Sequence, residues 1–311
     1  MLRSRILTFL KNLLPDYDHF QTFLTKYVPI GYKYPIFLDY PVRPRQRYTQ
    51  ENPHPLLYEI MNKNRKLYED WLRRIEAYLK YFEAIPLNAD DKPTGIAEPA
   101  WINRYIPPLD SMALYTFLAS TNPRHYFEVG SGNSTKFARR AIRDHKLTTH
   151  ITSIDPQPRA EIEGISDRSI RLPLEEVALS IFQKLDDGDI LFIDNSHRIF
   201  MNSDATTFFL DVLPYLKPGV LVQLHDIWLP YDYPEAWKFR YYSEQYCLAM
   251  LLLADQGQRY EIILPNMFIS FDRSLCDILD ATIWQHPHLS DVAHHGGSFW
   301  FKIRKLNSAR Q

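Results

Sequence analysis

The stretch Tyr126-Phe-Glu-Val-Gly-Ser-Gly-Asn-Ser-Thr-Lys136 passes from an apolar run through two closely spaced glycines into a helical pattern. Further along, the apolar run Ile151-Thr-Ser-Ile ends in Asp155, 23 residues after Gly132 (155 − 132). Glycines between a strand and a helix allow a tight turn and the close approach of a ligand, and an acid at the end of the next strand suits a ribose diol. Together the two stretches predict a nucleotide-type cofactor site in an open α/β sheet.

The loop lacks one feature of a dinucleotide site. The dinucleotide fingerprint has a third glycine, but here Ser134 and Thr135 follow Asn133. An acidic residue, Glu128, also stands before the first glycine, and a carboxylate facing the loop suits a cationic ligand better than a pyrophosphate. The loop resembles motif I of the class I S-adenosylmethionine-dependent methyltransferases.

This resemblance implies a site for S-adenosylmethionine and a role for each of several residues. Glu128 would face the methionine ammonium, Gly130 and Gly132 would let the backbone approach the cofactor, and Asp155 would hold the ribose hydroxyls. The alternative is a strand–turn–helix that needs glycine only for its geometry. The expected cofactor-binding residues are Glu128, Gly130, Ser131, Gly132, Asn133, Ser134, Asp155 and Asp194.

Length and composition exclude several classes of protein. A chain of 311 residues is either one large α/β domain with additions or two domains. The net charge is −1, with 36 basic and 37 acidic residues, so the chain has no electrostatic footprint for nucleic acid. Two cysteines make no disulfide framework, which favours a reducing, cytoplasmic location. No apolar run reaches the roughly 18 to 20 residues of a membrane span.

The first 108 residues have a pattern of their own. Residues 27–55 are rich in proline, which predicts an extended, irregular segment, whereas residues 56–82 carry apolar side chains at helical spacing. Residues 1–14 have a basic start and an interrupted apolar body without a small-residue cleavage site. This favours a helix packed on the protein or on a second subunit over a signal peptide or a membrane-surface helix. We expect residues 1–108 to form an α-rich extension that covers the substrate cleft and supports a homodimer.

The rest of the chain, residues 109–311, alternates between strand and helix patterns. This alternation predicts a mostly parallel, Rossmann-like sheet with right-handed crossovers, preceded by a helix that Asp110 caps and that continues through Leu118. By resemblance, a final strand after Gly296-Gly297 would be the antiparallel seventh strand of a class I methyltransferase, with residues 272–295 as an insertion before it. The expected strands are 125–129, 150–154, 168–172, 189–194, 219–225, 260–264 and 298–303, and the helices between them are near 134–145, 174–185, 203–216 and 243–254.

Polar residues follow two neighbouring strands of the expected sheet. Asp189-Ile-Leu-Phe-Ile is followed by Asp194-Asn-Ser-His197, and Gly219-Val-Leu-Val-Gln-Leu is followed by His225-Asp226. Parallel strands buried on both faces are apolar along their length, and ligands bind beyond their carboxyl ends. We therefore expect Asp194, His197, His225 and Asp226 to converge on one rim. His197 or His225 would be the general base, with Asp226 as its orienting partner.

The spacing of Ile193-Asp-Asn-Ser-His197, Leu216-Lys-Pro-Gly219 and His225-Asp226 resembles that of a family of small-molecule O-methyltransferases. This family includes catechol and sugar O-methyltransferases and the cephalosporin-hydroxylase-like proteins. Many members hold a divalent ion, and the matching ligands here would be Asp194, His225 and Asp226. His225 departs from that pattern, because the family has a carboxylate at this position. Imidazole would favour Mn²⁺, Fe²⁺ or Zn²⁺ over Mg²⁺, or the metal is lost and a histidine is the base.

Two further segments are candidates for a role at the site. The aromatic and proline-rich loop from Trp228 to Trp237 would be a lid, a substrate wall or a cover for the sheet edge. The histidines at 286, 288, 294 and 295 lack tight ligand spacing, which favours a solvated loop over a metal site.

The sequence predicts an S-adenosylmethionine-dependent methyltransferase that acts on a small-molecule, sugar-like or aromatic, hydroxyl. One alternative is a NAD-dependent oxidoreductase on a Rossmann sheet, which the absent third glycine disfavours. Another is a metal-dependent oxygenase or hydrolase that uses Asp194, His197 and His225. A non-catalytic binding protein with the same fold is the third.

Overall fold

The computed structural model describes residues 40–88, 98–158, 162 and 164–305. The chain divides into two units, residues 1–45 and 46–311, and every helix and strand named below lies in the second. The predicted helix at 1–14 lies outside the described residues, so the dimer contact expected there stays a prediction. Among the described residues, no helix is both long and apolar enough to span a bilayer.

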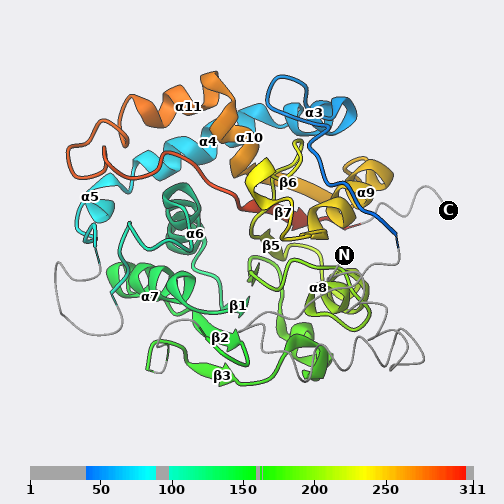
Figure 1. Ribbon diagram of the computed structural model, residues 1–311. Helices are drawn as coiled ribbons and strands as arrows, with labels where there is room; N and C mark the ends of the chain where they lie inside the picture. The colour runs from blue at the N-terminus through cyan, green and yellow to red at the C-terminus, as the bar shows by residue number, and fades with distance from the viewer. Residues whose placement is uncertain (1–39, 89–97, 159–161, 163, 306–311) are drawn as a thin grey trace, which may run out of the picture. The chain divides into compact units, whose positions relative to one another are not determined.

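A seven-stranded sheet organises the second unit (Figure 1). The strand order is β3-β2-β1-β4-β5-β7-β6, and β7 runs antiparallel to both of its neighbours while the remaining pairs are parallel. The strands are β1 His125–Val129, β2 His150–Ile154, β3 Arg168–Ile170, β4 Ile190–Ile193, β5 Leu221–Leu224, β6 Tyr260–Pro265 and β7 Phe299–Ile303. The predicted fold class and the antiparallel last strand are confirmed.

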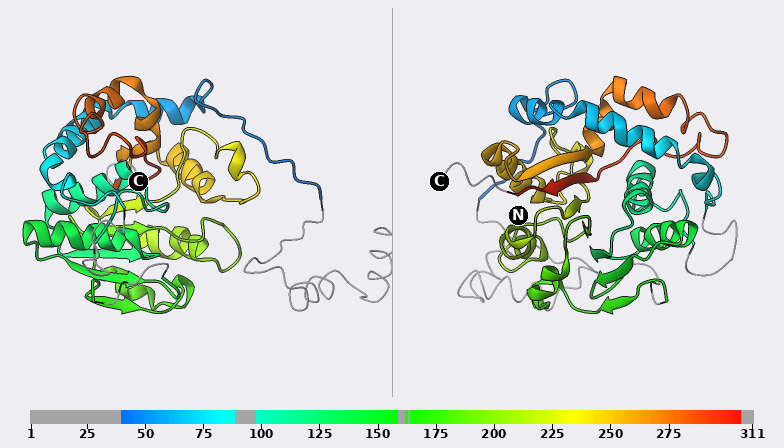
Figure 2. Two further views of the ribbon diagram at one scale, coloured as in Figure 1. Left: turned by 60° about the vertical axis from the view of Figure 1, so that its left-hand side comes forward. Right: turned by 180° about the vertical axis from the view of Figure 1, so that it is seen from behind.

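Helices cover both faces of the sheet. Figures 1 and 2 show α6 (Pro108–Thr121) and α7 (Asn133–His145) on one face, and α8 (Asp204–Thr207) and α9 (Glu244–Asp255) on the other. Every residue of β1, β2 and β4 except the first of β1 and the first of β2 is buried, as expected for parallel strands covered on both faces. The strand order reverses between β1 and β4, and a ligand site of an open α/β sheet lies at such a point.

The segment before α6 contributes three helices, α3 (Pro55–Asn62), α4 (Arg65–Glu76) and α5 (Leu79–Phe82). Helix α4 contacts β6, α6 and α11, and α3 contacts α9. The region between β6 and β7 contains α10 (Asn266–Phe271) and α11 (Arg273–Asp280). The predicted boundary at 108/109 and the insertion at 272–295 stay predictions, although these contacts join both segments to the β6 end of the sheet.

Two predicted helices are replaced by short turns of other types. The segment expected to be helical at 174–185 has the 3₁₀ turns η1 (Leu174–Glu176) and η2 (Leu179–Lys184). The segment at 203–216 has α8, the π-helical turn η3 (Phe208–Val212) and the 3₁₀ turn η4 (Leu213–Tyr215). Threonine, valine and phenylalanine are weak helix formers, and the proline at 214 cannot donate a helical hydrogen bond. These properties explain why one continuous helix does not form.

Candidate active site

The loop between β1 and α7 packs directly against the end of β4. Gly130 has φ +80°, and its N–H donates to the carbonyl oxygen of Ile154 at 3.0 Å. A Cβ at this position would lie 1.9 Å from the carbonyl oxygen of Asp194. Glycine is therefore required here by the backbone conformation and by the neighbouring strand.

Glu128 is fully buried beneath this loop. Its carboxylate accepts hydrogen bonds from the hydroxyls of Ser153, Thr135, Tyr126 and Ser134, at 2.5 to 3.2 Å. Burial raises its pKa to about 7, against the lowering effect of these hydroxyls. The sequence suggested that Glu128 faces the methionine ammonium, but all four of these partners belong to the protein. The contacts join β1, β2 and the start of α7.

Asp155 lies where the sequence placed it, directly after β2, and is half-buried. Its Oδ2 accepts the N–H of Ser131 at 2.8 Å and its Oδ1 accepts the N–H of Gln157 at 2.7 Å. The carboxylate thus connects the glycine-containing loop to the end of the neighbouring strand. Its expected contact with the ribose of a cofactor stays a prediction.

The loop lines a small cavity of about 60 Å³. Typical ligand pockets measure roughly 300 to 1,000 Å³, so this cavity is too small for a nucleoside cofactor. Tyr105 and Ile106, from the segment that precedes α6, line the cavity together with the loop. The other lining residues are Ser131, Gly132, Asn133, Ser134, Phe192, Asp194 and His225.

The carboxyl ends of β4 and β5 bring the second set of predicted residues together. Ile193 pairs with Leu224 in the sheet, and the N–H of His225 donates to the carbonyl oxygen of Ile193 at 2.9 Å. Asp194 and His225 are therefore neighbours because their strands are neighbours. His197 and Asp226 have φ of +62° and +55°, a conformation that side chains adopt at a cost of about 1 to 3 kcal/mol and that is frequent at functional sites.

His225 has a buried carboxylate partner that the sequence interpretation missed. Its Nε2 lies 3.4 Å from Oδ2 of Asp110, which belongs to the first turn of α6 and is fully buried. Asp110 was expected to cap that helix. Instead, α6 begins at Pro108, and the Asp110 carboxylate accepts hydrogen bonds from the Nδ2 amide of Asn266 (2.7 Å) and the N–H groups of Gly297 (2.8 Å) and Ser298 (2.9 Å).

His197 has a comparable partner. Its Nδ1 is hydrogen-bonded to Oε1 of Glu244, the first residue of α9, and the carboxylate of Glu244 is fully buried. The ring of Tyr242 packs against the imidazole with a centroid distance of 4.5 Å. The backbone carbonyl of His197 also accepts the N–H of Ser243 at 2.8 Å, which fixes the start of α9 beside the histidine.

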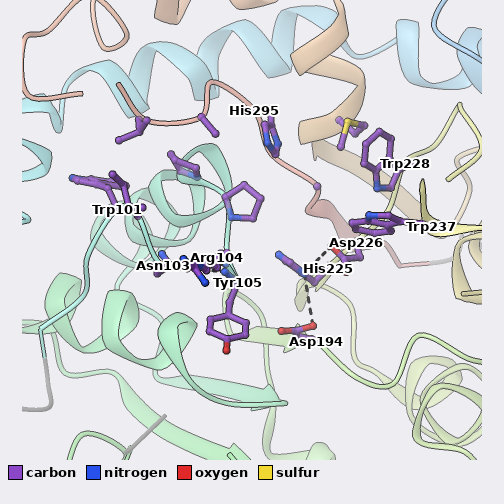
Figure 3. A pocket seen from close by; sticks show the side chains of 18 of the residues that line it. Trp101, Asn103, Arg104, Tyr105, Asp194, His225, Asp226, Trp228, Trp237 and His295 are labelled. Carbon is purple, nitrogen blue, oxygen red and sulfur yellow. Dashed lines mark hydrogen bonds and ion pairs between the residues drawn. The ribbon is translucent and has the colours of Figure 1, made fainter. Parts of the chain in front are cut away.

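The other nitrogen of each imidazole faces the same pair of aspartates, as Figure 3 shows for His225. His197 Nε2 lies 3.3 Å from Asp194 Oδ1 and 3.6 Å from Asp226 Oδ2. His225 Nδ1 lies 3.7 Å from Asp194 Oδ1 and 3.4 Å from Asp226 Oδ1. The expected convergence of the four residues is present. The orienting role expected for Asp226 stays a prediction, and each imidazole has a further carboxylate neighbour, Asp110 for His225 and Glu244 for His197.

These charges shift the pKa values of both histidines. Burial lowers the pKa of His225, but the charges of Asp226 and Asp194, together with Asp110, outweigh it and raise the pKa to about 9. Burial also opposes protonation of His197, yet the charge of Glu244 raises its pKa well above the usual value. The bond to His225 and the other donors lower the pKa of Asp110 in spite of its burial, so Asp110 stays ionised.

The divalent ion predicted at Asp194, His225 and Asp226 receives no support. Within the described residues, no group of three or more histidine, cysteine, aspartate or glutamate side chains is arranged to hold a metal ion. This finding extends to the four histidines near the C-terminus, which go to separate partners. His286 pairs with Glu83, His288 with a backbone carbonyl and His294 with the ring of Trp284, while His295 lines a cavity.

A larger cavity of about 690 Å³ opens above the two histidines. Its floor is Asp194, His197, His225 and Asp226. Figure 3 shows Trp101 at one side and Trp228 and Trp237 at the other, with His295 across from the floor. Residues 101–108, the aromatic loop that begins at Trp228 and the segment 291–297 supply the walls. The aromatic loop is thus a wall of this cavity.

Comparison with known proteins agrees with this geometry. A family model described as a methyltransferase domain matches residues 127–227, which include the glycine loop, Asp155 and the polar ends of β4 and β5. The matched residues run from β1 to just beyond the end of β5. No curated protein sequence matches the chain significantly. The match supports neither the oxidoreductase nor the metal-dependent oxygenase or hydrolase alternative.

Solved structures with a similar arrangement are distant in sequence. One is an S-adenosylhomocysteine-bound methyltransferase of Podospora anserina, with 14% identity, a TM-score of 0.39 and coverage of 76% of this chain and 88% of that chain. An O-methyltransferase of Streptomyces achromogenes, involved in tomaymycin synthesis, has 14% identity, a TM-score of 0.40 and coverage of 74% and 96%. An O-methyltransferase of Bacillus cereus has 14% identity, a TM-score of 0.38 and coverage of 83% and 100%.

Three residues outside the matched region contribute to the contacts around the two histidines. Asp110 precedes β1, Glu244 follows the aromatic loop and Asn266 begins α10. Glu244 had a weak signal in the sequence, as an acid at the start of a predicted helix. Asn266 had none, because its contact with Asp110 joins residues 156 positions apart.

Proposed function

We propose that this methyltransferase domain transfers a methyl group from S-adenosylmethionine to a hydroxyl group of a small molecule. The observation that carries the proposal is the pair of imidazoles, each backed by a buried carboxylate, at the floor of a cavity of about 690 Å³ beside the motif I loop. A hydroxyl acceptor must lose its proton as it is methylated, and an imidazole held in place by a carboxylate is suited to take it.

The cofactor would occupy the region beside the β1–α7 loop. Asp155 would accept the ribose hydroxyls, and residues 131–134 would offer backbone and side-chain polar groups at the start of α7. When bound, S-adenosylmethionine would supply a methyl group on a sulfonium, and an in-line nucleophile would take this methyl group as the bond from carbon to sulfur breaks and S-adenosylhomocysteine leaves. Because the described cavity is only about 60 Å³ there, Tyr105 and Ile106 must move away from the loop to admit it. We propose that the N-terminal extension acts as a lid through this movement of Tyr105 and Ile106.

We assign the base to His225. Its Nδ1 faces Asp194 and Asp226 at the floor of the cavity, and its Nε2 faces Asp110, whose carboxylate stays ionised because three other donors hold it. The acceptor hydroxyl would give its proton to Nδ1 of the neutral imidazole while its oxygen forms the new bond to carbon. Asp110 would stabilise the resulting imidazolium, as the buried aspartate does in other histidine–carboxylate pairs. His197, whose Nδ1 is hydrogen-bonded to Glu244, would position the acceptor oxygen.

A pH profile tests this assignment. With methyl-labelled S-adenosylmethionine and a panel of hydroxylated aromatic and sugar acceptors, kcat/KM should rise with pH to a plateau above about 9, because His225 must lose its proton first. Asp110→Asn removes a charge that favours the imidazolium, so the rise should move to lower pH and the plateau should fall. His225→Gln should lose activity by a factor of about 100 or more but keep cofactor binding.

His295→Gln is the matched control, since His295 lines the cavity without belonging to either histidine–carboxylate pair. It should keep the pH dependence of the wild type. A chelator should leave the rate unchanged. Activity that vanishes with chelator and returns with a divalent ion, together with loss of that ion in Asp194→Ala, would reject the histidine mechanism in favour of a metal.

A further inference from the structure

The walls of the large cavity are charged differently from its floor. Asp194 and Asp226 make the floor acidic, whereas Arg104 and Arg240 are exposed and line the same cavity from two different segments. Arg104 belongs to the segment before α6, close to Asn103 and Tyr105 in Figure 3, and Arg240 follows the aromatic loop. An acceptor that enters would therefore meet cations at the walls and carboxylates at the reaction centre.

Arg240 is held in position by aromatic rings. The central carbon of its guanidinium lies 4.0 Å from the centre of the Trp237 ring and 5.6 Å from that of Tyr242, and both rings line the cavity. No acidic side chain among the described residues forms an ion pair with it, while its neighbour Lys238 is paired with Glu235. A guanidinium stacked on an indole keeps its N–H fork available for an anion.

Arg104 also lies in a fixed stretch of backbone. Oδ1 of Asn103 accepts the N–H groups of Tyr105 and Ile106, both at 3.0 Å, and Arg104 between them has φ +65°. The described residues give its guanidinium no acidic partner within ion-pair distance. Asp291 also lines the cavity, and this single aspartate does not neutralise two arginines.

We propose that the acceptor is a hydroxylated ring that carries an anionic group, a carboxylate or a phosphate, which Arg104 and Arg240 bind while the hydroxyl meets His225. The inference rests on the proposed function and adds the substrate class. The tryptophans of the walls suit the ring, since flat apolar surfaces bury aromatic and sugar rings. Bidentate contact with an arginine suits the anion. Repulsion from Asp194 and Asp226 keeps the anionic end away from the floor, so the charge pattern sets the orientation.

Matched pairs of probes test the proposal. Binding to the full chain, saturated with S-adenosylhomocysteine, would be followed by tryptophan fluorescence, because Trp101, Trp228 and Trp237 line the cavity. The pairs are 3,4-dihydroxybenzoate against 3,4-dihydroxybenzamide, and 4-hydroxyphenyl phosphate against hydroquinone. We expect the anionic member of at least one pair to bind about tenfold more tightly or better, the size of one charge-assisted hydrogen-bond contact. The pair that discriminates more strongly identifies the anion.

Substitutions then identify the residues that cause the preference for the anionic probe. Arg240→Gln and Arg104→Gln should each reduce the discrimination between the members of a pair, and Arg240→Lys should restore only part of it, because lysine lacks the planar fork. Lys238→Gln is the matched control, since it removes an equal charge two residues from Arg240 without touching the cavity. This control should still bind the anionic member of the pair more tightly than the neutral one.

Three outcomes would overturn the proposal. They are equal binding of the charged and neutral members, a preference that persists after both arginines are replaced, and no binding of the anionic probes at millimolar concentration. A separate titration with S-adenosylhomocysteine distinguishes these results from failure of the proposed function. Absence of cofactor binding rejects the methyltransferase activity itself, whereas cofactor binding without anion preference rejects only the acceptor class.

Discussion

Gly130 and Gly257 form a natural comparison at the scale of single residues. Both have φ +80°, but an added Cβ would meet the Asp194 carbonyl at Gly130 and nothing within 4 Å at Gly257. Gly257→Ala should therefore cost about 1 kcal/mol of unfolding free energy, the effect of backbone conformation alone. Gly130→Ala should cost at least about 2 kcal/mol more, because β4 must shift away from the loop.

Urea denaturation of the two variants and the wild type measures this difference. Gly130→Ala should also lose cofactor binding, since the shift moves Asp194 and the loop together. Equal destabilisation by the two substitutions would show that the contact between the loop and β4 is not close in solution.

Asp110 shows what single residues in a sequence do not reveal. Its position before an apolar run correctly predicted the start of a helix, within two residues. Its carboxylate, however, contacts His225, Asn266 and the backbone of residues 297 and 298, all more than 100 positions away. An aspartate that caps a helix and an aspartate that pairs with a buried histidine look the same in a sequence. Only the tertiary structure distinguishes the two roles.

At the scale of elements, the strands were predictable and the connections were less so. All seven strands lie within about three residues of their expected positions, because parallel strands buried on both faces are short apolar runs bounded by polar residues. The residues at the ends of β4 and β5 could be predicted to meet for the same reason. The helices at 174–185 and 203–216 were wrong in type, since periodicity does not distinguish an α-helix from a series of 3₁₀ and π turns.

The β1–α7 loop was predictable in position but not in its contacts. Its residues lie between β1 and α7, as the pattern indicated. The burial of Glu128 under four hydroxyls depends on Ser153 from the neighbouring strand, and the closed cavity depends on Tyr105 from a distant segment. Both facts arise from tertiary contacts, which a local motif does not encode.

For the whole molecule, buried ionisable groups predict a loss of stability as the pH rises. The folded-state pKa of His225 is about 9, above its ordinary value of 6.5, so the folded state binds this proton more tightly. The resulting stability is fully present below about pH 6.5 and is lost as the pH rises through about 9. Glu128, raised from 4.5 to about 7, acts in the same direction at lower pH.

Denaturation between pH 6.5 and 9 measures the effect. The unfolding free energy of the wild type should fall by an amount on the order of 3 kcal/mol, as expected for a shift of this size in a buried group. His225→Gln should reduce the dependence over this range and leave the part that comes from His197, and His150→Gln, at an exposed position, should leave it unchanged. A wild-type stability that does not change between these pH values would show that His225 is not held in its charged form.

The central claim is that the sheet binds S-adenosylmethionine at the β1–α7 loop, and calorimetric titration with S-adenosylhomocysteine tests it most directly. We predict micromolar binding, about 8 kcal/mol, to the wild type and no binding of NAD under the same conditions. Asp155→Ala should weaken the binding by one to a few kcal/mol, through loss of the ribose contact and of the hydrogen bond to Ser131. A folded protein that takes up no S-adenosylhomocysteine, or that binds NAD instead, would contradict the account.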